Sequence, residues 1–145
     1  MTDISTIDLS GFRELQRAVG QNATDKGFRQ EGIAMSEIAH EIAPYDAALA
    51  ANQILANYFS KRLNLIHDEL SEAHEEIRNG HAPTEEYENT TPGKEGKPEG
   101  VPSELADIVI RTLDLADEYG IDLADVIVRK AQYNATREAL HGKKF

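Results

Sequence analysis

A helical pattern of unusual length, from Pro44 to Asn79, restricts the folds that are open to this chain. Proline suits the first turn of a helix because its missing N–H is not needed there. Gly80 follows the pattern, at a position where glycine ends many helices. No segment shows the alternation of Val, Ile or Thr that indicates a half-buried strand. The sequence therefore predicts an all-α fold, a bundle of four to five helices.

Shorter helical segments flank the long pattern. Ser10, Ser103 and Asp122 stand where the side-chain oxygen of an N-cap would accept a hydrogen bond from a free N–H. Gly27 and Gly120 stand where a glycine would end the first and fourth helices. One segment carries little pattern and predicts only a short helix. The predicted ranges are 11–26, 28–43 for the weak segment, 103–119 and 122–140.

The 145 residues fit a single domain covering 1–145, since domains commonly contain about 100 to 150 residues. Four of the five prolines lie in residues 81–102, which carry no aliphatic run. This segment is predicted to be an exposed loop. Loops of this length in a small domain are often functional or disordered.

The formal net charge of −11 argues against nucleic acid or an anionic membrane as the partner, because both are bound through basic surfaces. The sequence has no cysteine, which excludes disulfides and thiolate metal sites, and no apolar run near the ~20 residues of a membrane span. Its N-terminus lacks the basic and apolar regions of a secretory signal. We therefore expect a cytoplasmic protein, whose acidity serves solubility unless divalent cations bridge it to an anionic substrate.

Five carboxylates lie within residues 68–76 of the long helix, although like charges three or four residues apart repel each other. At about 100° per residue, three of them form one line along the helix, and this line is apolar toward the N-terminus. The line consists of Glu69, Glu72 and Glu76, continued by Leu65, Tyr58 and Ile54. A purely solvated face would not continue an apolar line in this way. A separate apolar stripe consists of Leu63, Ile66, Leu70, Ala73 and Ile77, and Asp68 and Glu75 flank the carboxylate line.

A second pair of carboxylates, Glu104 and Asp107, has the same spacing of three residues on the next predicted helix. Mg²⁺ and Mn²⁺ take oxygen ligands, and proteins commonly hold them with few carboxylates plus the phosphate oxygens of a substrate. Converging carboxylates of Glu69, Glu72, Glu104 and Asp107 would suit one or two such ions, with Mg²⁺ expected and Mn²⁺ as a substitute. Asp107 has a structural alternative, an ion pair with Arg111 one turn away.

The two predicted helices after the loop indicate what the protein binds, namely another subunit and an anion. The helix at 103–119 is apolar nearly all round, which indicates neighbours on several sides and a bundle completed by another subunit. On the last helix an apolar stripe that starts at Leu123 and Ile127 turns polar, and the polar residues are Lys130, Asn134 and Arg137. They could clamp an anion, although the helix dipole also favours cations near a C-terminus.

Other interpretations of the polar and aromatic residues stay open. Di-iron bundles use Glu-x-x-His pairs, and this spacing occurs at Glu37 and His40 and at Glu138 and His141, in the weak segment and at the chain end. His67 and His74 lie near the apolar stripe, which favours a packing or boundary role over ligation. The aromatic residues that could stack on a base, or equally fill the core, are Phe28, Tyr58, Phe59 and Tyr133.

In combination these motifs resemble a known family, the MazG-like all-α nucleoside triphosphate pyrophosphohydrolases. The family pattern is (E/D)ExxE, then ExxD after a variable gap, then Lys and Asn with a downstream Arg. The resemblance rests on DELSEAHEE at 68–76, SELADIVIRTLDLADEYGIDL at 103–123 and KAQYNATREALHGKKF at 130–145. It covers most of residues 60–145; residues 11–28 are compatible with the first helix of the family, and 29–57 are not matched.

The resemblance implies Mg²⁺-dependent hydrolysis of a nucleoside triphosphate to the monophosphate and pyrophosphate, in nucleotide-pool housekeeping or phage-type nucleotide metabolism. Glu69, Glu72, Glu104 and Asp107 would hold the metal, and Glu72 would orient or deprotonate the attacking water. Asp68 and Glu76 would support these ligands from behind, and Lys130, Asn134 and Arg137 would contact phosphates and sugar. A homodimer or homotetramer is also implied. The alternative is a helical oligomer that binds nucleotide and metal without catalysis.

Overall fold

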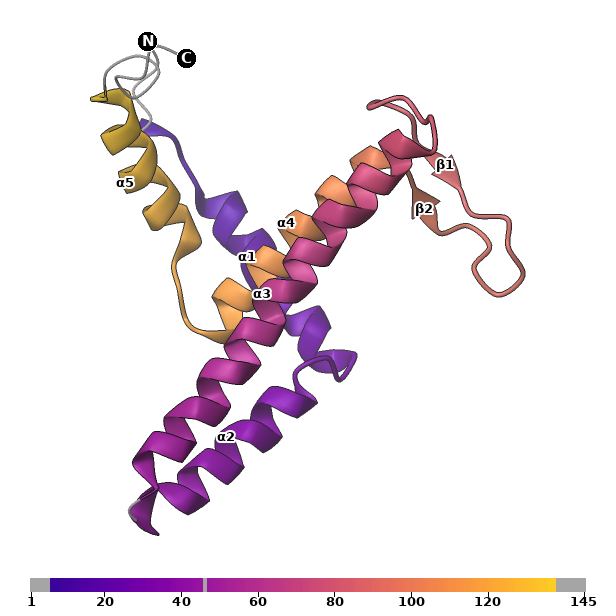
Figure 1. The fold of residues 1–145 in the computed structure, drawn as a ribbon. Coiled ribbons are helices and arrows are strands. Elements are labelled where there is room, and N and C mark those ends of the chain that lie inside the picture. The colour runs from indigo at the N-terminus through magenta and orange to yellow at the C-terminus, as the bar shows by residue number, and fades with distance from the viewer. Residues whose placement is uncertain (1–5, 46, 138–145) are drawn as a thin grey trace.

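The computed structural model describes residues 6–45 and 47–137, and these ranges contain five α-helices (Figure 1). The helices are α1 (Ser10–Asp25), α2 (Gln30–Ile42), α3 (Ala48–Arg78), α4 (Val101–Glu118) and α5 (Leu123–Ala135), with a 3₁₀ turn at Ala43–Tyr45. The prediction of an all-α fold is confirmed. None of the described helices is both long enough and apolar enough to cross a membrane.

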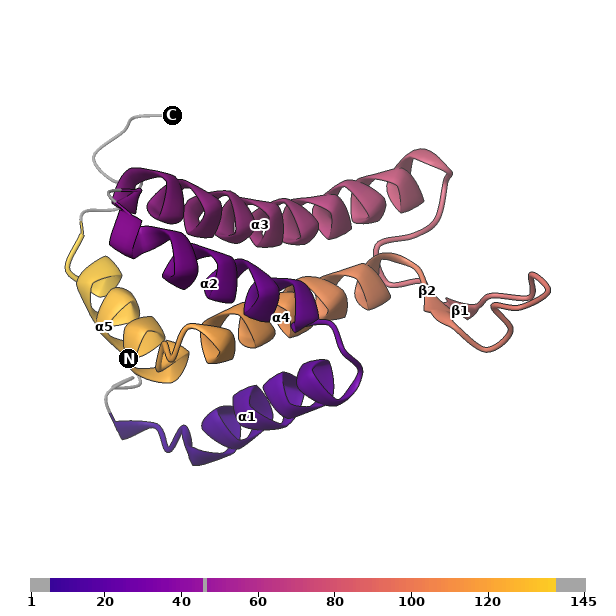
Figure 2. The same cartoon turned by 90° about the horizontal axis from the view of Figure 1, so that it is seen from below.

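Helix α3, with 31 residues, is the longest element and organises the others. Helix α2 packs along its N-terminal half and α4 along its C-terminal half, while α1 packs against α4 (Figures 1 and 2). Helix α5 contacts α1, at the end of the molecule opposite the loop that follows α3. Because α3 and α4 are neighbours, carboxylates on the two helices can meet between them.

Two predicted N-caps are wrong. The N–H and the hydroxyl of Ser10 both donate to the carboxylate of Asp8, and Ser10 lies inside α1. Helix α4 begins before Ser103, whose hydroxyl donates to the carbonyl of Pro98 at 2.9 Å instead of capping the helix. In both cases the hydroxyl donates a hydrogen bond to a nearby acceptor outside the helix.

Other helix ends agree better with the predictions. Asp122 caps α5 by accepting the N–H of Asp125, as predicted. Helix α5 ends at Ala135, and Leu140, the predicted end, lies outside the described residues. Pro44 lies in the 3₁₀ turn, so α3 starts later than predicted. The weak segment 28–43 contains a complete helix, α2, whose amphipathic pattern is faint.

The segment 81–102 is mostly exposed, as predicted, but it is not entirely irregular. It contains a short antiparallel hairpin of β1 (Tyr87–Glu88) and β2 (Pro98–Glu99), with Tyr87 opposite Glu99. The expectation that the chain has no strand is therefore corrected, because two residues per strand are too few for an alternation to be recognised. The hairpin lies beside the C-terminal end of α3 and the start of α4 (Figure 1).

The core of the single chain consists mainly of small side chains. Leu113 is the largest fully buried side chain in the described residues. The other buried apolar residues are Ala23, Ala39, Ala51, Tyr58, Ala73, Leu115, Ala116 and Ala124. Larger apolar side chains on α3 and α4 stay about half exposed, namely Leu63, Leu70, Ile77, Leu105 and Val109. The single chain thus leaves much apolar surface on these two helices uncovered.

Gly32 allows a close approach of α2 to α3, which can be tested by adding a methyl group. A Cβ atom at Gly32 would lie 2.6 Å from the hydroxyl of Tyr58 and 2.6 Å from Oε1 of Glu118, two atoms joined by a hydrogen bond of 3.0 Å. We expect Gly32→Ala to lower the free energy of unfolding by about 1–3 kcal/mol, the usual cost of overpacking.

The matched control is Gly11→Ala, because no heavy atom lies within 4 Å of a Cβ at Gly11. This change should leave the free energy of unfolding unchanged or raise it by about 0.5–1 kcal/mol, since alanine is the better helix former. Urea denaturation of both variants measures the difference. Equal stability of the two variants would contradict the close contact between α2 and α3.

Candidate metal centre

Three of the predicted carboxylates meet between α3 and α4. Glu69, Glu72 and Glu104 each offer one carboxylate oxygen, and these oxygens lie within 4.8 Å of one another. Glu69 and Glu72 are three residues apart on α3, and Glu104 enters from the first turn of α4. Glu69 is 4% exposed and Glu104 is 2% exposed, whereas Glu72 is open to solvent. The group therefore has two inner carboxylates and one outer carboxylate.

The carboxylate line of α3 lies on a side of the helix that the fold covers, as its apolar continuation indicated. Tyr58 and Glu69 are buried, and Leu65 is partly buried. The apolar stripe of the same helix is the more exposed one, with Leu63 and Leu70 being 48% and 49% exposed. In the single chain, then, the acidic line is covered at Glu69 and open at Glu72, while the leucines of the apolar stripe stay half exposed.

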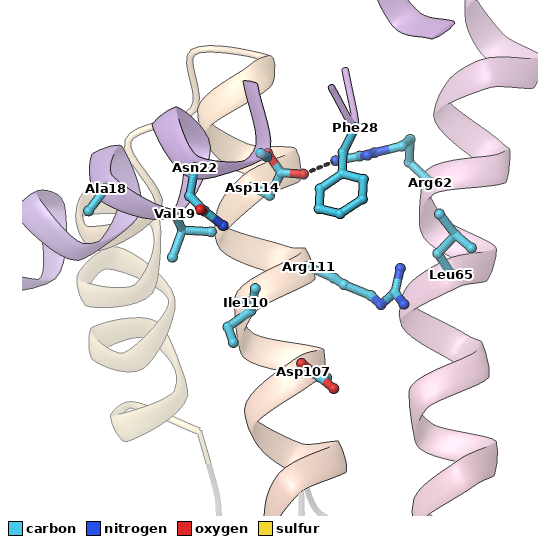
Figure 3. Close-up of a pocket in the computed structure, with 11 residues that line it drawn as sticks. Ala18, Val19, Asn22, Phe28, Arg62, Leu65, Asp107, Ile110, Arg111 and Asp114 are labelled. Carbon is cyan, nitrogen blue, oxygen red and sulfur yellow. Dashed lines mark hydrogen bonds and ion pairs between the residues drawn. The ribbon is translucent and has the colours of Figure 1, made fainter. Parts of the chain in front are cut away.

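Arg111 offsets part of the buried negative charge. Its Nη2 atom lies 2.5 Å from Oε1 of Glu69, and its side chain extends from α4 toward α3 (Figure 3). The ion pair therefore joins two helices, whereas the sequence suggested a pair with Asp107 on the same helix. Sequence spacing identifies neighbours along one helix only, so it could not reveal this partner of Glu69.

Glu104 has surroundings that suit a bound cation. Its Oε2 atom is buried and has no hydrogen-bond partner among the described residues. Burial, followed by the nearby carboxylates of Glu69 and Glu72, raises the pKa of Glu104 to about 7. A buried carboxyl in this position must keep its proton or be neutralised by a cation. Oxygen donors of this kind fit Mg²⁺ or Mn²⁺.

The raised pKa of Glu104 predicts how the stability of the metal-free protein depends on pH. The ordinary value of this pKa is 4.5, so between that pH and about 7 the folded state binds more protons than the unfolded state. The stabilisation is complete below the ordinary value and is lost as the pH rises through about 7. From about pH 5 to about pH 8, we expect this group to lower the Tm by on the order of 5 °C.

Calorimetry in EDTA across this pH range measures the effect, with Glu104→Gln as the comparison. The variant cannot ionise at this position, so its Tm should fall less with rising pH. A variant whose pH profile matches that of the wild type would contradict the raised pKa.

A cavity of about 540 Å³ lies beside the carboxylates, between α1, α3 and α4 (Figure 3). Asp107 and Arg111 line the cavity. Arg111 also forms the ion pair with Glu69, so it lies between the cavity and the carboxylates. Asp107 does not belong to the group of oxygens that meet within 4.8 Å. Asn22 also lines the cavity, as does Phe28, a residue that is 66% exposed. The volume is typical of small-molecule sites, which range from about 300 to 1,000 Å³.

The two residues expected behind the metal ligands differ in their surroundings. Asp68 is exposed. Glu76 is partly buried and accepts hydrogen bonds from the hydroxyl of Tyr87 at 3.1 and 3.2 Å. Glu76 thereby ties the hairpin to α3 one turn after Glu72.

The residues expected to bind phosphates lie together on and just after α5, away from the carboxylates. Lys130, Asn134 and Arg137 are all exposed. The charged groups of Lys130 and Arg137 lie 5.5 and 6.0 Å from the ring centre of Tyr133. Neither view of the fold places α5 beside the first turn of α4, which carries Glu104 (Figures 1 and 2). Within one chain, these three residues and the carboxylates form two separate groups.

The structure adds little support for the di-iron pairs, the two histidines of α3 or most of the aromatic candidates. Glu37 and His40 are exposed on α2, and Glu138 and His141 lie outside the described residues. His67 and His74 are exposed on α3. Of the aromatic candidates, Tyr58 is buried, Phe59 packs edge-on against Tyr119, and Phe28 and Tyr133 are exposed. Phe28 is the aromatic candidate that borders the cavity.

Comparison with known proteins found no relative of this chain. No family model matches the chain, and neither a curated protein nor a solved structure matches it. The resemblance to the MazG-like enzymes therefore stays a hypothesis that rests on the three motifs. What the chain can do must be inferred from the arrangement of its own residues.

Proposed function

We propose that this protein is a nucleoside triphosphate pyrophosphohydrolase that depends on Mg²⁺, with Mn²⁺ as a substitute. The observation that carries the proposal is the meeting of Glu69, Glu72 and Glu104, together with a buried oxygen of Glu104 that has no hydrogen-bond partner among the described residues. The adjoining cavity and the three motifs support the substrate class. The products would be the nucleoside monophosphate and pyrophosphate.

Each residue of the carboxylate group would have its own task. Glu69 and Glu104 would hold the cation from the buried side and Glu72 from the solvent side. A divalent cation there would neutralise phosphate charge and make a water molecule more acidic. Glu72, which is open to solvent, would orient the attacking water and accept its proton. Arg111, held by Glu69, would direct its remaining N–H groups at the phosphates as their charge is redistributed.

The cavity would bind the nucleoside. Phe28 exposes a ring on which a base can stack, and the amide of Asn22 can both donate and accept hydrogen bonds. Because Asp107 and Arg111 form the wall nearest the carboxylates, a nucleoside in the cavity would direct its phosphates toward Glu69 and Glu104.

We also propose that a second copy of the chain covers the apolar stripe of α3. Leu63, Leu70 and Ile77 are half exposed and recur every seven residues, the spacing at which helices pair. A second copy of the same helix would cover this stripe, and a standard interface covers roughly 800 Å² of each partner.

A second copy could also bring its α5 to the carboxylates, since within one chain α5 lies elsewhere. Light scattering of the wild type should therefore give the mass of at least two chains. Leu70→Glu should reduce that mass to one chain, because it places a charge in the stripe. A wild-type mass of one chain would contradict the association.

The catalytic proposal is tested by pyrophosphate release from a panel of canonical and modified (deoxy)nucleoside triphosphates, with Mg²⁺ and with EDTA. Glu69→Ala should abolish release, and so should Asp107→Ala, because the family pattern implies that Asp107 is a metal ligand. Glu75→Ala removes an exposed carboxylate of the same helix and should leave the rate unchanged. The proposal would be overturned if none of the triphosphates in the panel released pyrophosphate. It would also be overturned if release survived Glu69→Ala.

Two other outcomes would identify the alternatives. Binding of nucleotide and Mg²⁺ without release would indicate a non-catalytic oligomer that uses the same carboxylates. Two irons per chain in a metal analysis would instead indicate a di-iron protein.

A further inference from the structure

The hairpin after α3 carries a lysine that belongs to none of the motifs discussed above. Lys97 directly precedes β2, and its carbonyl accepts the N–H of Asn89 at 2.8 Å. Its Nζ atom lies 2.9 Å from Oε2 of Glu99. The other oxygen of Glu99 accepts a hydrogen bond from the side-chain amide of Asn89 at 2.8 Å. Both the backbone and the ammonium group of Lys97 are therefore fixed within the hairpin.

The base of the hairpin is fixed to the start of α4. Gly100 has a φ of +102°, and a Cβ there would lie 2.3 Å from the carbonyl oxygen of Glu85, so glycine alone fits this position. The N–H of Glu104 donates to the carbonyl of Gly100 at 3.2 Å. The hydroxyl of Ser103 donates to the carbonyl of Pro98. Lys97 and Glu104 are therefore connected by ordered chain.

The strand pairing places Lys97 near the carboxylate group. Its partner Glu99 lies opposite Tyr87, and the hydroxyl of Tyr87 donates to Glu76, one turn after Glu72 on α3. The hydrogen bond to Glu99 raises the pKa of Lys97, and the negative charges of Glu104 and Glu72 add to this effect. The side chain of Lys97 is 48% exposed, and an ammonium group has three N–H donors. Donors that Glu99 does not use are therefore open to an anion beside the hairpin.

The order of these groups along α4 indicates which part of a substrate would meet Lys97. Along the chain the hairpin comes directly before α4, and Glu104 lies in the first turn of that helix. Asp107 and Arg111 come later in α4 and line the cavity. A nucleoside triphosphate whose nucleoside fills the cavity would extend its phosphates past Glu104 toward the hairpin. Helix α5, which carries Lys130 and is followed by Arg137, lies at the other end of the molecule (Figures 1 and 2).

We propose that Lys97 is a positioning residue that binds the pyrophosphate part of the substrate beside the cation held by Glu69, Glu72 and Glu104. This inference rests on the proposed function. It has a distinctive consequence, because a fixed positive charge beside the carboxylates repels a divalent cation and attracts an anion. Removing the charge should strengthen the binding of the metal alone and weaken the binding of pyrophosphate.

The variants are Lys97→Met, which keeps the aliphatic stem, and Lys97→Arg, which keeps the charge. Lys94→Met, in the same hairpin, is the matched control. Calorimetric titration with Mn²⁺ alone should give a Kd about two- to fivefold lower for Lys97→Met than for the wild type. Titration of the Mg²⁺-loaded protein with inorganic pyrophosphate should give a Kd about tenfold higher, the usual effect of one hydrogen bond to a charged group.

Lys97→Arg should restore most of both affinities, and Lys94→Met should behave as the wild type. In the turnover assay Lys97→Met should raise KM more than it lowers kcat. A wild type that binds Mn²⁺ and releases pyrophosphate, with Lys97→Met indistinguishable from Lys94→Met, overturns this inference alone. Weakening of both Mn²⁺ and pyrophosphate binding by Lys97→Met also overturns it, because that result indicates a structural role. A wild type that binds no Mn²⁺ overturns both this inference and the proposed function.

Discussion

Glu104→Gln is expected to make the metal-free protein more stable and to abolish the proposed release of pyrophosphate. The carboxyl is 2% exposed and one of its oxygens has no partner among the described residues, so ionisation destabilises the folded state. With the pKa of Glu104 raised to about 7, the neutral amide should raise the free energy of unfolding by about 1–3 kcal/mol near pH 8. Loss of a proposed metal ligand should reduce pyrophosphate release by at least about 100-fold.

Calorimetry in EDTA and in Mg²⁺, together with the release assay, measures both effects. Mg²⁺ should raise the Tm of the wild type, because a ligand that binds only the folded state stabilises it, and it should not raise that of Glu104→Gln. Glu72→Gln is the matched comparison: it should also abolish release, but with little change in metal-free stability, because Glu72 is open to solvent. A Glu104→Gln variant that loses stability in EDTA would show that the carboxylate has an unseen structural partner.

Asp114→Ala is expected to lower the free energy of unfolding by about 3 kcal/mol or more, because it removes the partner shared by two largely buried arginines. Oδ1 of Asp114 accepts hydrogen bonds from Nε and Nη2 of Arg29 at 2.9 and 2.7 Å, and Oδ2 accepts one from Arg62. Arg29 keeps an ion pair with Asp117, and Arg62 keeps one with Glu118. These remaining pairs place the effect toward the lower end of the roughly 3–5 kcal/mol that breaking a buried pair costs.

The matched control is Glu31→Ala, which breaks the exposed ion pair between Lys61 and Glu31 that also joins α2 to α3. Its effect should stay below about 1 kcal/mol, because water screens exposed pairs. Urea denaturation followed by circular dichroism compares the two variants. Similar losses in both would mean that the buried charges around Asp114 contribute no more than surface charges do.

The helices that the sequence predicted well are those with a marked apolar face. The long pattern, the helix near 103–119 and the Asp122 cap all follow from local spacing, and the structure agrees with them to within a few residues. Helix α2 was only weakly predicted because it meets α3 through small residues such as Gly32 and Ala39, which give a faint periodicity. The hairpin is stabilised by Asn89 and Glu99 across the turn, and two-residue strands leave no pattern.

The candidate site divides in the same way. The spacing of three residues puts Glu69 and Glu72 on one face of a helix, so this pair of carboxylates could be predicted from the sequence. That Glu104 joins them, and that Arg111 pairs with Glu69, depends on how α3 and α4 pack. Lys97 is separated from the carboxylates of α3 by the whole loop, and only the path of the hairpin brings its charge to them.

The unbroken course of α3 makes the candidate site sensitive to chain length as well as to side-chain chemistry. Arg62 and Glu69 lie on the same helix and both bind residues of α4, namely Asp114 and Arg111. One inserted residue between them would rotate the following part of α3 by about 100° and shift it by about 1.5 Å. The carboxylates would then turn away from α4. The hairpin tip at 90–95, outside the pairing of Asn89 with Gly96 and Lys97, is by contrast a place where the chain can gain or lose residues without moving the carboxylates between α3 and α4.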